Sequence, residues 1–254
     1  MELQGQSVVV SGGASGLGAE TVRHLVNAGA RVAILDVNEQ AAKQLAEETG
    51  GLALACDITD TNSIETALAA AAEANGPARV LVNCAGVAGA MRLVSKDGDL
   101  MPLEHFSRIV NINLIGTFNV IRLFTARVVK LEPLESGERG VIINTASVAA
   151  FDGQVGQEAY AASKGGVASL TLPLARDLAQ FGVRAMTIAP GLFQTPLLKE
   201  LPAHVQESLA ASIPFPKRLG DPGEFAALAL HIVSNPSLNG ETIRLDGALR
   251  LPPR

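Results

Sequence analysis

Apolar residues along this chain fall into seven short runs, separated by longer stretches in which they recur every three or four positions. Short runs bounded by turn residues are typical of buried strands, and the longer pattern is typical of amphipathic helices. Regular alternation of the two predicts a parallel sheet covered by helices on both faces. The runs are 7–11, 31–35, 51–55, 79–83, 140–144, 183–189 and 242–245, and the helical segments lie near 17–28, 39–49, 61–74, 103–130, 157–181 and 222–234.

No linker rich in proline or glycine and no internal repeat divides these segments. We therefore predict one α/β domain over residues 1–254, a doubly wound Rossmann-type fold with a seven-stranded parallel sheet. Three longer stretches lack a regular pattern, at 88–102, 131–139 and 191–221. Long loops in a compact domain tend to carry function, and two of these follow strands directly, at the sheet edge where such folds bind ligands.

The first apolar run leads straight into the sequence SGGASGLG, residues 11–18, and then into a helical pattern. Glycines here let the backbone approach a pyrophosphate, and the helix N-terminus offers free N–H groups and a positive dipole. Glycines also make ordinary turns, but the position between a strand and a helix favours dinucleotide binding. We interpret Gly12, Gly16 and Gly18 as a dinucleotide-binding loop.

Acidic residues end the second and third apolar runs. Asp36 lies 18 residues beyond Gly18, where a carboxylate can accept hydrogen bonds from both adenosine ribose hydroxyls and would repel a 2′-phosphate. Neither Ser15 nor Val37 is basic, so the pattern predicts NAD rather than NADP. Asp36 could instead cap the following helix, and the two roles are compatible. Asp57 is placed to bond the adenine amino group.

The single tyrosine of the chain lies in EAYAASKGG, residues 158–166, with a lysine four positions later. On a helix Tyr160 and Lys164 share one face. Alone, the pair could be a half-buried tyrosine beside a snorkelling lysine. Ser147, however, follows the fifth run and precedes the tyrosine by thirteen residues. A serine at one strand end and a tyrosine–lysine pair on the next helix would therefore converge on the cofactor side of the sheet.

Taken together, these motifs resemble the short-chain dehydrogenase/reductase family over nearly the whole chain. The matching features are the glycine loop, Asp57, NCAG at 83–86, Asn113 in NINLIGTF, Ser147, Tyr160 with Lys164, and PGLFQTP at 190–196. The resemblance implies that Ser147 orients the substrate oxygen, that Tyr160 is the acid/base group that exchanges its proton, and that Lys164 also holds the nicotinamide ribose. A nearby ammonium favours the phenolate, so Lys164 would lower the pKa of Tyr160. It further implies that Asn113 anchors a water of a proton relay, although Asn113 could simply buttress a helix.

The resemblance also extends the expected cofactor site to the ends of the later strands. The backbone of Ile188 and the hydroxyl of Thr195 would fix the carboxamide. Ser11 stands where the family usually has threonine, and Cys84 replaces an asparagine of NNAG. The expected cofactor residues are Ser11, Gly12, Ser15, Gly16, Leu17, Gly18, Asp36, Asp57, Ile58, Asn83, Ala85, Gly86, Tyr160, Lys164, Pro190, Gly191, Phe193 and Thr195.

Segments from residue 103 onward are similar to the type II 3-hydroxyacyl-CoA dehydrogenase subgroup, which also includes enzymes acting on 17β-hydroxysteroids. This implies reversible oxidation of an (S)-3-hydroxyacyl-CoA with NAD. Residues 191–221 would form a substrate lid, with apolar side chains that face the acyl chain or simply pack. Gln154 could line the substrate pocket or bond loop backbone. The expected substrate residues are Ser147, Gln154, Tyr160 and Leu198, with Phe193, Leu197, Leu198 and Leu201 as the apolar lid residues.

Other functions remain open at this level. A hydroxysteroid dehydrogenase or another short-chain alcohol dehydrogenase would use the same site. A 3-ketoacyl-carrier-protein reductase usually prefers NADPH and places basic residues that this chain lacks. A non-catalytic NAD-binding scaffold often loses the tyrosine or the lysine, whereas both are present here. Family members are commonly homotetramers, and the apolar circumference of NVIRLFTARVV, residues 119–129, suits such an interface.

The composition limits the kinds of binding partner and the cellular compartment that we expect for this chain. The net charge of −5 gives no basic footprint for nucleic acid, and the four histidines show no metal-ligand spacing. Two cysteines do not make a disulfide framework, which suggests a reducing compartment. No targeting peptide is visible, and no apolar run approaches the roughly 18 residues of a membrane span. We therefore expect a cytoplasmic enzyme that binds a small-molecule substrate, without nucleic acid, membrane or metal.

Overall fold

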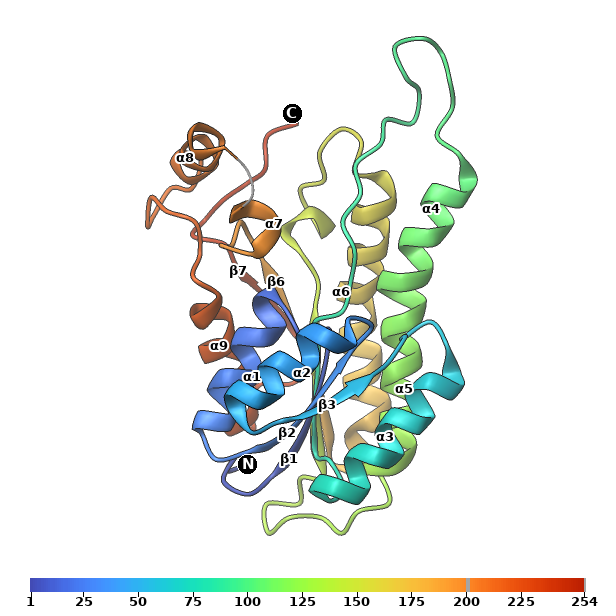
Figure 1. Ribbon diagram of the computed structural model, residues 1–254, viewed down its shortest axis with the longest axis vertical. Coiled ribbons are helices and arrows are strands. Elements are labelled where there is room, and N and C mark those ends of the chain that lie inside the picture. Colours follow the sequence, from blue (N-terminus) through green and yellow to red (C-terminus); the bar gives the residue numbers. More distant parts are fainter. Residues whose placement is uncertain (200–201, 254) are drawn as a thin grey trace.

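All seven predicted strands lie in one parallel sheet in the computed structural model, which describes residues 1–199 and 202–253 (Figure 1). The strand order is β3-β2-β1-β4-β5-β6-β7, so the chain winds outward from β1 in one direction and from β4 in the other. The reversal between β1 and β4 opens a crevice at their carboxyl ends. The strands are β1 (Ser7–Ser11), β2 (Arg31–Asp36), β3 (Leu52–Ala55), β4 (Val80–Asn83), β5 (Gly140–Thr145), β6 (Val183–Pro190) and β7 (Thr242–Leu245).

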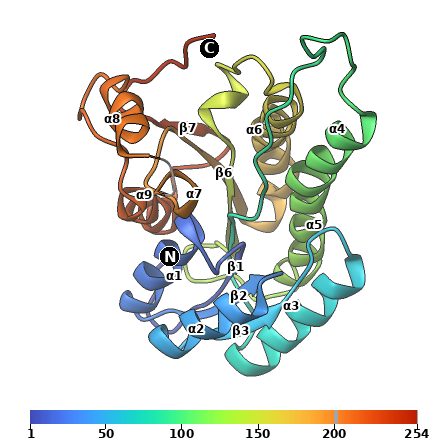
Figure 2. The ribbon, with the colours of Figure 1, turned by 45° about the horizontal axis from the view of Figure 1, so that its top comes forward.

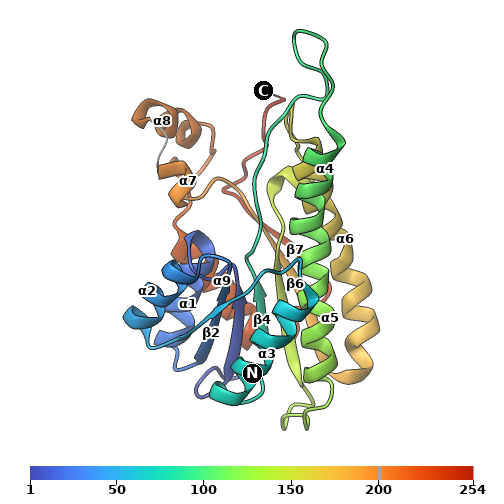
Figure 3. The same ribbon diagram turned by 45° about the vertical axis from the view of Figure 1, so that its right-hand side comes forward.

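Helices cover both faces of the sheet (Figure 3). Alternate residues of each central strand enter different cores: Val8 and Val10 pack with α1, α2 and α9, whereas Val9 packs with α3 and α5. Strands buried on both faces explain the unbroken apolar runs, and the predicted fold class is confirmed. The helices are α1 (Gly16–Asn27), α2 (Glu39–Thr49), α3 (Thr61–Asn75), α4 (Leu103–Val110), α5 (Thr117–Val128), α6 (Glu158–Leu178), α7 (Pro196–Lys199), α8 (Ala203–Ala211) and α9 (Pro222–Ser234).

Two expectations about helices need correction. The helix expected over 103–130 is divided, because a π-helical segment, η1 (Asn111–Gly116), joins α4 to α5. Gly116 packs so closely that an added Cβ would stand 2.9 Å from Ile58. The stretch 191–221, expected to be irregular, contains α7 and α8. Such short helices leave too few residues for a clear amphipathic pattern.

The stretch Leu103–Val128 is long and apolar enough, by length and composition, to cross a membrane, with a mean hydropathy of 1.4. The sequence expectation concerned an unbroken apolar run, and this helix interrupts its apolar residues with Arg108, Asn111, Asn113 and Arg122. Half of that window is buried inside the domain. Val120, Ile121 and Phe124 lie in the core between α5 and the sheet, which is the arrangement of a core helix.

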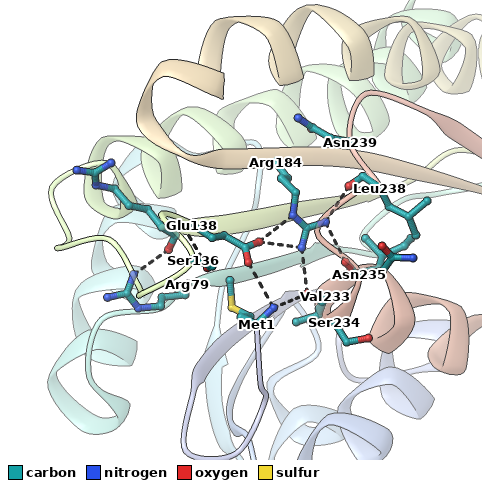
Figure 4. A network of polar contacts seen from close by, with 12 residues as sticks. Met1, Arg79, Ser136, Glu138, Arg184, Val233, Ser234, Asn235, Leu238 and Asn239 are labelled. Carbon is teal, nitrogen blue, oxygen red and sulfur yellow. Dashed lines mark hydrogen bonds and ion pairs between the residues drawn. The ribbon is translucent and has the colours of Figure 1, made fainter.

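The amino edge of the sheet holds a buried network of charges (Figure 4). Arg184 at the start of β6 pairs with Glu138 at 2.8 Å, and both side chains are less than a tenth exposed. The guanidinium also donates to the carbonyls of Ile232, Val233 and Leu238. Each buried charge is thereby paired and hydrogen-bonded, as burial of ions requires. The network ties the loop before β5 to β6 and α9.

Candidate active site

A cavity of about 810 Å³ lies at the carboxyl edge of the sheet. Figure 2 shows that edge with α7 and α8 on one side and α4 on the other. Among the expected site residues, those lining the cavity are Gly12, Ser15, Gly16, Leu17, Gly18, Asp36, Asp57, Ile58, Ala85, Gly86, Ser147, Tyr160, Lys164, Pro190, Gly191, Phe193, Thr195 and Leu198. Ser11, Asn83, Asn113 and Gln154 are not among the lining residues.

The glycine loop has the geometry that a dinucleotide diphosphate needs. Gly12 has φ +64°, and a Cβ there would stand 2.4 Å from the backbone nitrogen of Ala85, so the ends of β1 and β4 pack backbone to backbone. Helix α1 begins at Gly16 without a side-chain cap and without an acidic residue in its first turn. Its free N–H groups therefore remain for an anion. The residues present fit a bound dinucleotide.

Asp36 connects the end of β2 to this loop. Its carboxylate accepts from the backbone nitrogens of Ala14, at 3.0 Å, and Asn38, at 2.9 Å. The cap of α2 is Asn38, whose side chain accepts from Ala41. Asp36 is therefore not the helix cap that the sequence left open. Asp36 lines the cavity, and its oxygens retain lone pairs for ribose hydroxyls.

Ser147, Tyr160 and Lys164 meet at the other end of the cavity. Ser147 follows β5, where its hydroxyl accepts from the backbone nitrogen of Ala149 at 3.2 Å. Tyr160 and Lys164 lie in the first turns of α6, and the Lys164 Nζ is 5.9 Å from the centre of the tyrosine ring. That Nζ donates to the carbonyl of Thr145 at 2.8 Å. The three side chains that the sequence singled out thus share one space.

Burial governs the titration of this pair. It raises the pKa of Tyr160 above its ordinary value, and a hydrogen bond with Ser147 acts in the opposite direction. Burial also lowers the pKa of Lys164 to about 8, against a smaller opposing influence of Cys84. The expectation that Lys164 depresses the pKa of Tyr160 does not describe this state of the site. A positive charge bound in the cavity would favour the phenolate.

Asn113 lies in η1 and is fully buried. Its side chain accepts from the backbone nitrogen of Val87 at 2.8 Å and donates to the Val87 carbonyl at 2.9 Å and the Ser163 hydroxyl at 3.1 Å. Asn113 thus clamps the loop after β4 to the residue before Lys164. This is the buttressing role that the sequence left open, and its part in a proton relay stays a prediction.

Ser11 and Asn83 form part of a ladder across the sheet. The Ser11 hydroxyl donates to Asn83 at 3.0 Å, and the Asn83 amide donates to Asn144 at 2.9 Å. These residues are register partners on β1, β4 and β5 and are all buried. They hold the strand ends in register beneath the cavity. Asn144 was missed, although a polar residue inside the apolar run VIINT was its signal.

Only some of the expected substrate residues line the cavity. Leu198 lines the cavity, and Phe193 is buried in its wall. Gln154 instead donates to the carbonyl of Pro252 at 3.0 Å, which is the backbone bond that the sequence allowed as its alternative. Leu201 and the side chain of Leu197 lie outside the described residues.

Several cavity residues were not anticipated. Cys56, Thr59, Val87, Ala88 and Thr145 adjoin expected residues at strand ends, so their neighbours were a signal. Arg108 and Ile112 come from the α4–η1 helix, where the sequence did not show which face would meet the cavity. Over residues 1–199 and 202–253, no group of three or more histidines, cysteines or acidic residues could hold a metal ion.

The family model described as short chain dehydrogenase matches residues 6–206. Proteins named 3-hydroxyacyl-CoA dehydrogenase type-2 from Rattus norvegicus and Homo sapiens are 51% and 52% identical over 254 residues, 99% of this chain and 97% of each relative. A crystal structure of 3-hydroxyacyl-CoA dehydrogenase type-2 from Mycobacterium avium is 43% identical, covers 98% of both chains and has a TM-score of 0.95. The chain therefore belongs to the short chain dehydrogenase family and is an oxidoreductase that acts on CH–OH groups.

Proposed function

We propose that this enzyme oxidises (S)-3-hydroxyacyl-CoA to 3-ketoacyl-CoA with NAD, and catalyses the reverse reduction. The observation that carries the proposal is the identity of 51% and 52%, over 99% of the chain, to two proteins named 3-hydroxyacyl-CoA dehydrogenase type-2. The meeting of Ser147, Tyr160 and Lys164 at one cavity supports it, because an alcohol oxidation needs an acid/base group at the oxygen. No particular observation favours a steroid or a carrier-protein substrate.

The chemistry divides between the bound cofactor and the side chains. NAD, when bound, supplies the acceptor for the hydride that leaves the hydroxyl-bearing carbon. Tyr160, as the phenolate, takes the proton that leaves the hydroxyl oxygen, so one hydride and one proton are removed together. Ser147 donates a hydrogen bond to the same oxygen and orients it. Lys164, fixed to the Thr145 carbonyl, holds positive charge beside the phenol when it is protonated.

Asp36 supports NAD over NADP. Asp36 lines the cavity, as do the uncharged residues Leu17 and Val37, and Val37 is exposed. A 2′-phosphate at this position would meet a carboxylate without a cation to offset it. The glycine loop and the uncapped α1 terminus would hold the diphosphate.

A substrate panel tests the proposal. Purified enzyme with NAD and 3-hydroxybutyryl-CoA should produce reduced nicotinamide, measured by absorbance, with NADP as the matched cofactor control. Longer acyl-CoAs, a 17β-hydroxysteroid and a simple secondary alcohol complete the panel. Turnover of the steroid or alcohol without turnover of any acyl-CoA would contradict the substrate assignment. Preference for NADP would contradict the role of Asp36.

The homotetramer also belongs to this proposal. Ile115, Phe118 and Leu172 are exposed on the outer face formed by η1, α5 and α6, and an exposed apolar surface of this kind favours association. Light scattering coupled to gel filtration should give four copies, and Phe118→Glu should reduce that number. A monomeric wild type would contradict the assembly. A cytoplasmic location is proposed from the sequence and can be tested by fractionation.

A further inference from the structure

Arg108 is a positively charged residue that lines the catalytic cavity and whose side chain has no partner among the described residues. It lies in the last turn of α4, and it lines the cavity together with Val87, Ala88 and Ile112. The side chain is exposed, and no hydrogen bond or ion pair joins it to another residue of the described chain. None of the catalytic or cofactor roles assigned above uses this residue.

The other charges of the cavity are already engaged. Among the described lining residues the charged ones are Asp36, Asp57, Lys164 and Arg108. Asp36 accepts two backbone hydrogen bonds, Asp57 accepts from Thr59, and Lys164 donates to Thr145. Arg108 is therefore the uncommitted cation of this wall. A planar guanidinium offers parallel N–H donors that match the oxygens of a phosphate.

An ordinary helix-capping role does not explain Arg108. Arginine in a last turn can bond the free carbonyls of a helix end and stabilise its negative pole. Here α4 does not end, because Asn111 keeps helical geometry and the chain continues through η1 into α5. The carbonyls near Arg108 are thus inside a continuing helix. Arg184, by contrast, makes an ion pair and donates hydrogen bonds to three carbonyls.

We propose that Arg108 binds a phosphate group of a ligand in the cavity, and that this phosphate belongs to the coenzyme A part of the substrate. The choice of coenzyme A rests on the function proposed above. The cofactor diphosphate is the other source of the same chemistry, but the glycine loop and the α1 terminus already serve it. A substrate with several phosphates must also enter a protein of net charge −5, so a local cation at the wall would offset that repulsion.

Arg108→Gln tests the proposal with two substrates of the same acyl group. One is 3-hydroxybutyryl-CoA, and the other is its N-acetylcysteamine thioester, which has no phosphate. We expect the KM for the CoA ester to rise about 10- to 100-fold, as loss of a charged hydrogen bond predicts. The KM for the N-acetylcysteamine thioester, the KM for NAD and kcat should stay within about twofold of the wild type. Arg108→Lys keeps the positive charge but lacks the paired N–H donors of the guanidinium, so its KM for the CoA ester should lie between those of the wild type and Arg108→Gln.

Arg176→Gln is the matched control, since Arg176 is exposed in the last turn of α6 and loses the same charge. It should leave both KM values unchanged. A raised KM for NAD, with equal effects on both thioesters, would assign Arg108 to the cofactor phosphate instead. Unchanged KM values for NAD and for the CoA ester would overturn the phosphate assignment. A circular dichroism melt confirms that each variant is folded.

Binding of free coenzyme A separates this inference from the proposed function. Calorimetric titration of wild type and Arg108→Gln with coenzyme A, in the presence of NAD, requires no turnover. Weaker binding by the variant supports the role of Arg108 even if the enzyme oxidises no acyl-CoA. Equal affinities would overturn the coenzyme A assignment whatever the substrate panel gives. Raising the salt concentration should weaken binding more for the wild type, because it screens the Arg108 charge.

Discussion

The two edges of the sheet differ in how fully their buried charges are paired. At the amino edge, Arg184 and Glu138 are paired at 2.8 Å, and the guanidinium is surrounded by carbonyls (Figure 4). At the carboxyl edge, the buried Lys164 has one carbonyl partner and an adjacent cavity of about 810 Å³. A buried charge with all its partners offsets its desolvation, and removing one partner is costly, whereas a buried ammonium without a counter-ion is typical of a functional site.

Tyr160→Phe should have the largest effect and should act on rate alone. Without the hydroxyl, the proton of the substrate alcohol has no acceptor at the site, so kcat should fall about 10²- to 10⁴-fold. NAD binding, measured by titration, should stay near the wild-type value. A variant with near-normal kcat would break the comparison, because the carboxyl edge would then contain no dedicated acid/base residue.

Glu138→Gln should act on stability alone. It leaves Arg184 buried without its counter-ion, which should lower the free energy of unfolding by about 3–5 kcal/mol. The charge of Glu39, which pairs with Lys43 on the surface, provides the matched control, and Glu39→Gln should change little. Denaturant unfolding measures both. A loss of kcat with unchanged stability in Glu138→Gln would reverse the roles of the two edges.

Lys164 should give the pH dependence of stability an identifiable contribution. Burial lowers its pKa from 10.5 to about 8, so between these values the unfolded chain binds more protons than the folded protein. The contribution of Lys164 to stability should therefore rise with pH across this interval, by about 3 kcal/mol in total. Unfolding of wild type and Lys164→Met at several pH values from 7 to about 10 measures it. Parallel curves for the two proteins would show that the lysine keeps its ordinary pKa.

Gly12→Ala should lower stability less than Glu138→Gln does, and it should also weaken cofactor binding. The added Cβ would collide with the Ala85 backbone at 2.4 Å, at a position whose φ of +64° already disfavours alanine. We expect about 1–3 kcal/mol of destabilisation together with weaker NAD binding. Gly50→Ala is the control, because its φ is +75° and no atom lies within 4 Å of the added Cβ. Equal NAD affinity in both variants would contradict the role of the loop.

Much of the fold was predictable because the central strands β1, β4, β5 and β6 are buried on both faces and read as apolar runs, and the half-buried edge strands β3 and β7 are still rich in apolar residues. The bounds of β1 and β7 are those expected from the sequence, and the cavity gathers Ser147, Tyr160 and Lys164 as the motifs indicated. Features that depend on distant contacts were not predictable. The pairing of Glu138 with Arg184 joins positions 46 residues apart. The sequence around either residue does not indicate that its side chain is buried.

The titration of the site was the least predictable feature. Proximity of Lys164 to Tyr160 follows from their spacing, but the depth of burial that shifts both pKa values comes from the whole domain. The same holds for Arg108, whose access to the cavity depends on how α4 is rotated against the loop after β4. Sequence identified the chemistry of the site, and packing determined its environment.

The ladder of Ser11, Asn83 and Asn144 also constrains how this protein can change over time. Each rung joins a particular position on one strand to its partner on the next. Insertion or deletion of a single residue in β1, β4 or β5 would turn a buried side chain to the opposite face. Length differences among descendants of this chain should therefore accumulate in 88–102, 131–139 and 191–221, leaving the strands that hold the ladder at constant length.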